Sequence, residues 1–192
     1  LDADVCVHPD ALERVAAAFE RDSSLDAVIG SYDDEPESGD FLSQYRNLMH
    51  HFVHHRGRQR ACTFWSGCGA IRRDVFLEMG GFDESYARPS IEDIELGYRL
   101  HARGRKILLD PSIQVKHLKR WTLWGLIKTD VLQRGIPWTE LILRDRHMPN
   151  DLNLQLSQRI SVALAFLIAA MGLFGAVYWR GYFLVPIFAL LF

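Results

Sequence analysis

The amino-acid sequence predicts an α/β domain followed by an amphipathic segment and membrane-spanning helices. Short apolar runs alternate with helical patterns over residues 5–115, and this alternation is typical of the α/β class. Residues 121–143 then mix Trp and Arg with aliphatic residues, as helices lying in the headgroup plane of a bilayer do. Residues 160–179 finally form a run of twenty residues without a charged side chain.

Composition narrows the classes of protein that fit. The 192 residues suffice for one hydrophobic core with an appendage, but not for two full domains. A formal net charge of −2 argues against a nucleic-acid partner. The three cysteines form no CxxC pair, so we expect no disulfide framework and a reducing, cytosolic setting. The chain shows no signal peptide and does not begin with Met, which predicts a fragment of a longer protein.

The first thirty residues predict one helix and one strand. Residues 5–7 are too short to stand as a strand of their own. A helix opens at residues 8–10, because Pro is tolerated in a first helical turn, and apolar residues then recur at a spacing of three to four (Leu12, Val15, Ala16, Phe19). Residues 25–30 (LDAVIG) predict a buried strand, whereas residues 31–40 (SYDDEPESGD) predict a solvated loop.

The middle of the chain predicts a second helix and a second strand. Residues 41–55 show helical spacing of apolar side chains through Phe41, Tyr45, Leu48, Met49 and Phe52. A basic stretch follows at residues 56–60, and residues 61–65 have the composition of a strand. Residues 66–69 (SGCG) then predict a tight glycine turn.

Two helices and two short strands complete the α/β pattern. Residues 73–79 predict a short helix ended by a Gly-Gly pair, and residues 91–102 predict a helix that Gly104 stops. Residues 106–109 and 113–115 are expected to form short strands separated by Asp110-Pro111.

The C-terminal third predicts membrane association. Residues 121–143 fit an interfacial amphipathic segment, and a core-packing helix with a charged outer face is the alternative. A helix over residues 160–179 would be about 30 Å long and match the hydrocarbon thickness, and residues 182–192 begin a second apolar run. Basic residues precede the first run (Arg144, Arg146, His147, Arg159), so the polar domain is expected in the cytosol. The sequence therefore predicts a multi-pass protein of the inner or plasma membrane, with a buried soluble helix pair as the alternative.

Four groups of residues are candidates for chemistry. Asp2-Ala3-Asp4 offers two carboxylates for Mg²⁺ or Mn²⁺, although Asp-X-Asp is common in solvated loops. Glu92 and Asp93 lie at a predicted helix start, where they fit either helix capping or general-base chemistry. The stretch "HLKRW" at residues 117–121 offers a diphosphate clamp and a stacking surface, or a membrane-interface anchor. His50, His51, His54 and His55 have the i,i+4 spacing of zinc ligands, but a polar helix end is the favoured interpretation.

The order of these pieces resembles the membrane-bound family 2 glycosyltransferases. The resemblance rests on Asp-X-Asp, then "FWSGCGAIRRDVFLEMGGFDE", "IEDIELGYRLHARGRKI" and "HLKRW", followed by apolar helices. It covers nearly all of residues 1–121 and implies the GT-A fold, a Rossmann-like α/β domain that binds a nucleotide sugar. The implied organisation is a partial GT-A domain over residues 1–120, an interfacial segment over 121–158 and transmembrane helices over 159–192.

The resemblance also implies site residues. Asp4 would coordinate a metal that bridges the donor diphosphate, with Asp2 near the ribose or the same metal, and Asp93 would be the catalytic base. Further substrate contacts would come from Glu92, Ser66, Gly67, Arg120 and Trp121. His117 stands where the family's Gln-X-X-Arg-Trp motif has Gln, which leaves open a metal ligand, a diphosphate contact or a structural role.

The implied reaction is a single displacement that inverts the anomeric configuration. The donor would be a nucleotide sugar, the acceptor a lipid-linked sugar or a growing glycan, and a single addition is favoured over processive synthesis. The family's nucleotide-binding first half would precede Asp2, so this stretch alone is expected to be inactive. A membrane scaffold built on a degenerate transferase is the rival interpretation, although it would need neither Asp4, Asp93 nor Arg120.

Overall fold

The computed structural model describes residues 1–86 and 89–178. The chain divides into two compact units, Leu1–Leu152 and Asn153–Phe192. The first unit contains the sheet, its covering helices and most of the predicted amphipathic segment. The described part of the second unit contains one long helix.

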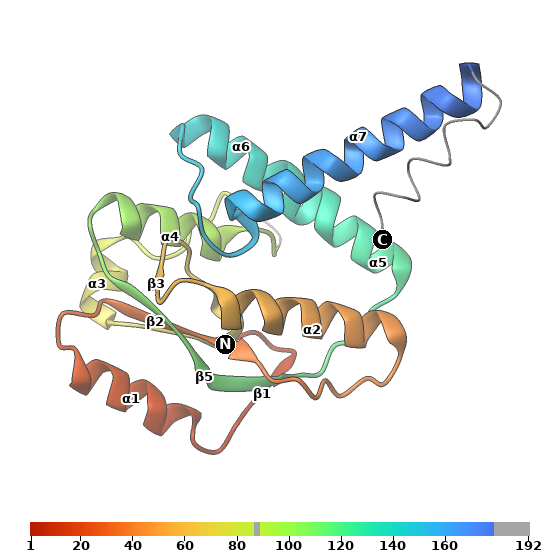
Figure 1. The fold of residues 1–192 in the computed structure, drawn as a ribbon. Helices are drawn as coiled ribbons and strands as arrows, with labels where there is room; N and C mark the ends of the chain where they lie inside the picture. Colours follow the sequence, from red (N-terminus) through yellow and green to blue (C-terminus); the bar gives the residue numbers. More distant parts are fainter. Residues whose placement is uncertain (87–88, 179–192) are drawn as a thin grey trace. The chain divides into compact units, whose positions relative to one another are not determined.

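A mixed sheet organises the first unit (Figure 1). Its strand order is β1-β5-β2-β4, and β3 pairs with another part of β5. Strands β2 and β5 run parallel, whereas the other pairs are antiparallel. The bounds are β1 (Val5–Val7), β2 (Ala27–Tyr32), β3 (Arg60–Ala61), β4 (Gly69–Ile71) and β5 (Ile107–His117). The predicted α/β class is thereby confirmed.

Strand β5 replaces two predicted strands with one. It continues through Asp110-Pro111, so the expected break between residues 109 and 113 is wrong. The partner register shifts here, because Ile29 pairs with Leu109 but Ser31 pairs with Gln114. A proline is tolerated at such an irregularity, where no ladder hydrogen bond from its nitrogen is needed.

Three other strand predictions need correction. Residues 5–7 do form a strand, because the long β5 supplies its partner. Strand β2 extends two residues beyond Gly30, so Ser31 and Tyr32 are buried strand residues rather than loop residues. In the predicted strand 61–65 only Ala61 joins the sheet, whereas Phe64 and Trp65 are buried without ladder pairing.

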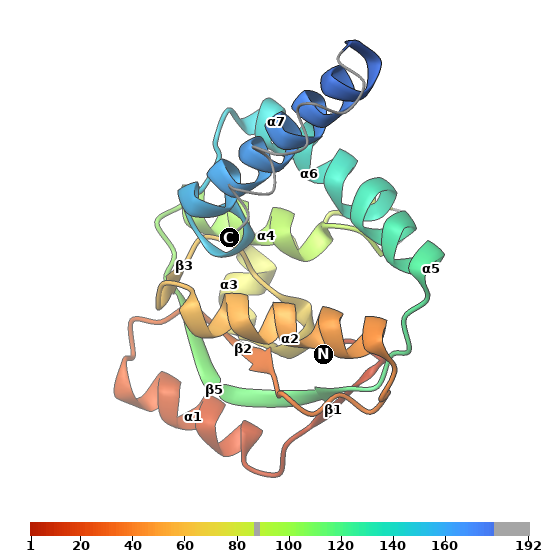
Figure 2. The same ribbon diagram turned by 45° about the vertical axis from the view of Figure 1, so that its right-hand side comes forward.

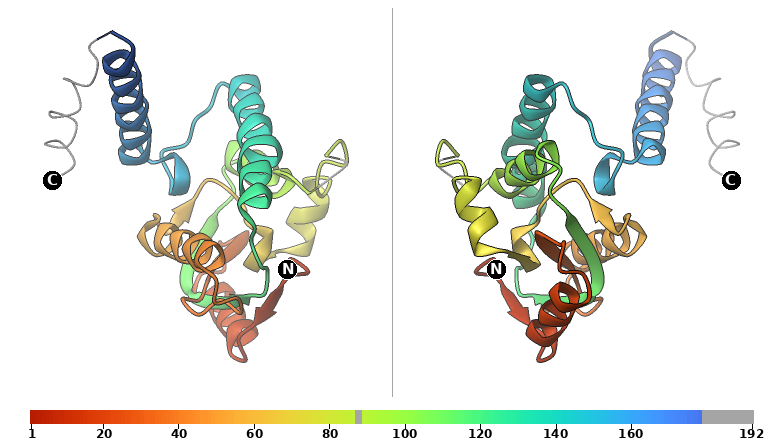
Figure 3. Two further views of the ribbon diagram at one scale, coloured as in Figure 1. Left: turned by 90° about the vertical axis from the view of Figure 1, so that its right-hand side faces the viewer. Right: turned by 90° about the vertical axis from the view of Figure 1, so that its left-hand side faces the viewer.

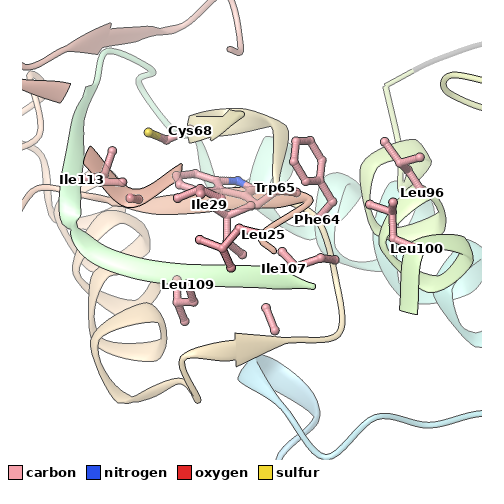
Figure 4. Packing of buried hydrophobic residues seen from close by; sticks show 14 of the residues in the cluster. Leu25, Ile29, Phe64, Trp65, Cys68, Leu96, Leu100, Ile107, Leu109 and Ile113 are labelled. Atoms are coloured by element: carbon pink, nitrogen blue, oxygen red, sulfur yellow. The ribbon is translucent and has the colours of Figure 1, made fainter. Parts of the chain in front are cut away.

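Helices cover both sides of the sheet (Figures 1 and 2). Helix α1 (Ala11–Arg21) lies on one side, and α2 (Phe41–Arg56) and α4 (Glu92–Ala102) lie on the other. A short α3 (Arg73–Glu78) follows β4. Figure 4 shows the core between these layers, with Leu25, Ile29 and Leu109 from the sheet region, Phe64 and Trp65 from the connecting chain, and Leu96 and Leu100 from α4.

Helix α2 has the predicted bounds but an inverted orientation. Its buried side chains are Ser43, Asn47 and His54, all polar. Its apolar residues Phe41, Tyr45, Leu48 and Phe52 are exposed, whereas Val53 is partly buried against the core. A surface helix normally turns its apolar side towards the core, so the spacing predicted the helix but not the side that it buries.

The predicted amphipathic segment forms three consecutive helical pieces. These are α5 (Leu123–Lys128), a π-helix η2 (Thr129–Gly135) and α6 (Ile136–Asp145). Leu141 is buried against Ile91 and Tyr98, and Asp130 forms an ion pair with Arg46 of α2 at 2.7 Å. One side of the segment therefore packs on the domain, while Leu123, Trp124, Val131 and Leu132 stay exposed.

The second unit contains α7 (Leu156–Tyr178). Within it, Leu156–Ala176 is the one helix of the described residues that is long and apolar enough to cross a membrane. It begins four residues before the predicted run. The second predicted span, residues 182–192, lies outside the described residues.

Gly97 allows α4 to approach the chain that leads into the site. A Cβ atom at this position would overlap the backbone of Thr63 and Phe64. We therefore expect Gly97→Ala to destabilise the first unit by about 3 kcal/mol, because backbone atoms cannot move aside as a side chain can. Thermal unfolding followed by circular dichroism measures the effect. Gly39→Ala is the matched control, since a Cβ there meets no atom within 4 Å, and equal melting temperatures for the two variants would contradict the prediction.

Candidate active site

A cleft of about 540 Å³ opens where the chain start, the end of β2 and the start of α4 converge. Figure 3 shows the chain start beside the stretch that follows β5, and the backbone N–H of Leu118 donates to the carbonyl of Asp4 there. The polar and aromatic side chains that line the cleft are Asp2, Asp4, Tyr32, Ser66, Ser90, Glu92, Asp93, His117, Lys119, Trp121, Thr129, Gln133 and Arg134. Most of the residues predicted from sequence thus share one cleft.

Ser66 links two carboxylates in this cleft. Its hydroxyl lies 2.8 Å from Oδ1 of Asp2 and 3.1 Å from Oδ2 of Asp93. Its backbone N–H donates to the same Oδ2 of Asp93 at 3.0 Å. A hydroxyl has only one hydrogen to donate, so the backbone N–H holds Asp93 even when the hydroxyl turns to Asp2. Residues far apart in the sequence therefore meet at Ser66.

Asp93 has the environment of a general base. It lies in the first turn of α4, where the helix dipole favours negative charge. Burial raises the pKa of its carboxyl above the ordinary value, while the hydrogen bond from Ser66 and the charge of Arg134 oppose that rise. A carboxylate with a raised pKa that lines a cleft is suited to accepting a proton near neutral pH.

Glu92 has a local structural partner as well as a place in the cleft. Its Oε2 accepts a hydrogen bond from the backbone N–H of Ser90 at 2.8 Å. The Ser90 hydroxyl in turn donates to the carbonyl of Gln133 at 2.5 Å. Glu92 and Ser90 therefore tie the start of α4 to η2. The carboxylate of Glu92 does not cap a first-turn N–H of α4, and its predicted role as a base or substrate contact stays a prediction.

Asp2 and Asp4 fit a cation that is shared with a substrate. Oδ2 of Asp4 lies 3.9 Å from Nε2 of His117 and 3.8 Å from the ammonium Nζ of Lys119, so neither side chain contacts it at hydrogen-bond distance. Among the described residues, no three His, Cys, Asp or Glu side chains form a cluster that would hold a metal alone. Mg²⁺ is commonly held by one or two carboxylates together with substrate phosphates and water, and two half-buried carboxylates in a cleft suit that mode.

His117 is a buried, neutral side chain at the end of β5. Burial lowers the pKa of its imidazole, and Asp4 opposes the shift. Its ring stacks on Tyr32 with centroids 4.3 Å apart. Its Nδ1 is buried without a hydrogen-bond partner in the part of the chain that the structure describes. Nε2 faces Asp4 in the cleft. This position is compatible with a metal ligand, a diphosphate contact or a structural role, so all three stay predictions.

Arg120 and Trp121 separate in the structure. The Arg120 side chain is 79% exposed, lies 3.8 Å from Asp40 and does not line the cleft. Trp121 lines the cleft but is buried, with its ring beneath the ammonium of Lys119 at 4.4 Å. In this conformation Trp121 lies at the site, whereas the predicted diphosphate contact of Arg120 would need its side chain to turn.

Gly67 contributes to the site through packing. It is buried beside Ser66, and a Cβ atom there would overlap the indole ring of Trp65. Only glycine lets the chain turn this closely past Trp65. Ser66 lines the cleft and Gly67 does not, so the predicted substrate contact of Gly67 stays a prediction while its structural role is evident.

Arg134 is the cleft cation that sequence reasoning missed. It lies in η2 and lines the cleft with Gln133. No ion pair joins it to a carboxylate of the described residues, although its charge lowers the pKa of Asp93. The sequence indicated only an arginine in an amphipathic segment. Arg134 lies in the cleft as part of a π-helix, and nothing in the sequence of residues 129–135 signalled a π-helix.

The histidine cluster lies beside the cleft as an aromatic stack. The rings of His50 and His54 lie 4.1 Å apart, and both contact the Trp65 ring. Nδ1 of His54 donates to the carbonyl of Gly30 at 2.7 Å, and burial lowers the pKa of His54 to about 4. The predicted polar helix end therefore does not describe His50 and His54, whose rings pack against the core because they face the sheet. The described residues provide no third ligand for zinc.

The whole chain matches one known family of proteins. Residues 1–192 match the family described as Glycosyl transferase family group 2. The chain belongs to this family. The mixed sheet with helices on both sides is the architecture expected of a GT-A-like domain of a family 2 glycosyltransferase, and the cleft holds the carboxylates that the family motifs indicated.

Parts of the chain are also similar to curated glycosyltransferases and related proteins. A stretch of 66 residues is 33% identical to the O-antigen biosynthesis protein RfbC of Myxococcus xanthus, covering 34% of this chain and 5% of that protein. A stretch of 90 residues is 36% identical to the N-acetylglucosaminyl-diphospho-decaprenol L-rhamnosyltransferase of two Mycobacterium tuberculosis strains, covering 46% of this chain and 29% of those proteins. The matched stretches thus span less than a third of these relatives.

Proposed function

We propose that the protein is an inverting glycosyltransferase that moves a sugar from a nucleotide-sugar donor to a hydroxyl of a lipid-linked or glycan acceptor. The observation that supports this most directly is the meeting of Asp2, Ser66 and Asp93 in a cleft that also contains Asp4. Membership of glycosyl transferase family group 2 supports the reaction class.

Asp93 acts as the general base. Its carboxylate accepts the proton of the acceptor hydroxyl as that oxygen attacks the anomeric carbon. The bond from the anomeric carbon to the nucleoside diphosphate breaks on the opposite face, and the diphosphate leaves with the electron pair. Attack opposite the leaving group inverts the configuration. The hydrogen bond from the Ser66 N–H keeps the carboxylate oriented for this step.

The leaving diphosphate requires positive charge. Asp4, with Asp2, would hold Mg²⁺ or Mn²⁺, which supplies charge neutralisation at the diphosphate when bound. Arg134 and Lys119, two cations that line the cleft, face the same region and would bind phosphate oxygens. These residues position the donor so that its anomeric carbon lies towards Asp93.

The relatives and the C-terminal helices support a proposal for the acceptor and for the location. One group of relatives is named for transfer to a diphospho-decaprenol acceptor, and we extend a lipid-linked acceptor to this chain. The exposed apolar side chains of α5 and η2 support a bilayer near the cleft, and the apolar α7 independently supports membrane association. We place the protein in the inner or plasma membrane, as a multi-pass protein with the cleft on the cytosolic face.

The direct test is transfer by the purified full-length protein. It should be incubated with Mg²⁺ or Mn²⁺, a panel of radiolabelled nucleotide sugars and polyprenyl-diphosphate-linked sugar acceptors. We expect labelled lipid product and stoichiometric nucleoside diphosphate with at least one donor. No transfer and no donor hydrolysis with any pair would contradict the proposal and favour a membrane scaffold.

Arg134 provides a prediction that separates two candidate phosphate contacts. We expect Arg134→Gln to lower kcat/KM for the donor by about 10–100-fold, because an unpaired guanidinium in the cleft is lost. Arg120→Gln is the matched control, and we expect less than about a twofold change because that side chain is exposed outside the cleft. Steady-state kinetics with varied donor measure both. A larger loss at Arg120 would show that its side chain turns into the site.

A further inference from the structure

The outer side of α2 presents an apolar surface that the domain leaves uncovered. Phe41, Tyr45, Leu48 and Phe52 follow one another at i, i+4, i+7 and i+11, which places them along one side of a helix. Each is between 44% and 79% exposed. The sheet side of α2 instead buries Ser43, Asn47 and His54. A helix that buries its polar residues and exposes its aromatic ones is inverted relative to an ordinary surface helix.

Positive charge lies at the C-terminal end of this surface. Arg56, Arg58 and Arg60 are exposed, and none of the three forms an ion pair with a carboxylate of the described residues. The Arg56 guanidinium lies 5.1 Å from the centre of the Phe52 ring. Unpaired arginines beside aromatic side chains match the headgroup boundary of a bilayer, where phosphates meet acyl chains.

The neighbouring η2 adds exposed apolar side chains beside α2. The Arg46–Asp130 ion pair holds η2 against α2, and Val131 and Leu132 of η2 are exposed. Aromatic side chains next to unpaired arginines complement an anionic lipid surface, whose acyl chains take the apolar side chains while its phosphates take the guanidinium groups.

We propose that the outer side of α2 docks on the headgroup–acyl boundary of an anionic bilayer. Phe41, Tyr45, Leu48 and Phe52 enter the boundary, and Arg56, Arg58 and Arg60 bind lipid phosphates. This surface is formed by α2 and residues 56–60 of the first unit, and η2 borders it. The inference rests on the proposed membrane association but not on sugar transfer, so it stands whether or not a donor is found.

The test places a reporter on α2 in the full-length protein. Leu48→Cys, in a background with Cys6 and Cys62 replaced by serine, is labelled with an environment-sensitive fluorophore and reconstituted at one chain per nanodisc. Leu12→Cys is the matched control, because Leu12 is an exposed leucine on α1, on the other side of the sheet. In nanodiscs containing phosphatidylglycerol, we expect a blue shift and at least twofold quenching by brominated acyl chains at position 48, and neither at position 12.

The same reporter tests whether docking depends on the arginines, and it gives the results that would contradict the proposal. Replacing Arg56, Arg58 and Arg60 with glutamine should reduce the quenching at position 48 at least twofold with anionic lipid and much less with phosphatidylcholine. Equal, unquenched emission at positions 48 and 12 would overturn the proposal. A blue shift that appears only when two chains share a nanodisc, and emission that brominated acyl chains do not quench, would assign this surface to a second copy. That outcome would also overturn the proposal.

Discussion

Replacing Asp93 with asparagine is expected to lower kcat for sugar transfer by about 10²–10⁴-fold, because the group that accepts the acceptor proton is lost. Asparagine has nearly the same shape, and its oxygen can still accept the hydrogen bond from the Ser66 N–H. Donor binding should therefore change little. Single-turnover transfer, measured alongside the donor dissociation constant, distinguishes the loss of chemistry from a loss of binding.

Stability should move in the opposite direction to activity in this variant. Because burial raises the pKa of Asp93 in the folded state, the ionised carboxylate destabilises the fold at pH values above the ordinary pKa of an aspartate. A neutral asparagine should leave the melting temperature unchanged or raise it. Asp74→Asn is the control, since Asp74 also lies in a first helical turn but is exposed outside the cleft. Loss of activity together with a lower melting temperature would point to misfolding rather than to a missing base.

The same raised pKa predicts the acid limb of the pH profile. Transfer requires the ionised form, so the rate should fall as pH decreases through a pKa above the ordinary aspartate value. This limb should disappear in Asp93→Asn, leaving only residual, pH-independent activity in the acid range. A wild-type rate that stays flat down to the ordinary aspartate pKa would contradict the assignment.

Removing the carboxylate of Asp4 is expected to lower kcat/KM by roughly 100–1000-fold, because a bound divalent cation would lose a charged ligand at the diphosphate. In wild type, a chelator should abolish transfer and added Mn²⁺ or Mg²⁺ should restore it. In Asp4→Asn, half-maximal activity should require a higher metal concentration. Metal titrations of both proteins give the comparison.

Asp34→Asn serves as the control for Asp4→Asn. Asp34 is an exposed carboxylate in the acidic loop after β2, so its removal changes net charge equally without changing the cleft. We expect wild-type metal dependence for it. Full activity of a protein shown to be metal-free by elemental measurement would exclude the role proposed for Asp4 and leave the diphosphate to Arg134 and Lys119.

Most of the helices and strands were predictable from local patterns, and the errors in the strands have one cause. Helices α1, α2, α3 and α4 follow apolar spacing and stop signals in or directly after their own residues. The strands were less certain because a strand depends on its partner. Val5–Val7 forms only against the far end of β5, and β5 passes Asp110-Pro111 because both sides of the irregularity pair with β2.

The candidate site was predictable as a set of residues but not as an arrangement. Motif order identified Asp2, Asp4, Asp93, His117 and Trp121, and all of them line the cleft. The sequence did not predict which arginine reaches the cleft. Arg120 and Arg134 have the same side chain, and only the path of the backbone after β5 decides that Arg134 lines the cleft. The role of Ser66 as a link between two carboxylates depends on contacts across 64 and 27 residues, and no local pattern encodes such contacts.

The π-helical piece between α5 and α6 restricts how this chain can change its length. A π-helix closes i→i+5 hydrogen bonds, so it contains an extra residue relative to an α-helix. Deleting that extra residue would restore a regular α-helix with little rotation of α6, whereas deleting a residue of α6, such as Thr139, would rotate all later residues by about 100° relative to Arg134. Either Arg134 would leave the cleft or Leu141 would leave its pocket beside Ile91 and Tyr98. Among descendants of this sequence, single-residue insertions and deletions should accumulate in the acidic loop after β2 and be eliminated from α6.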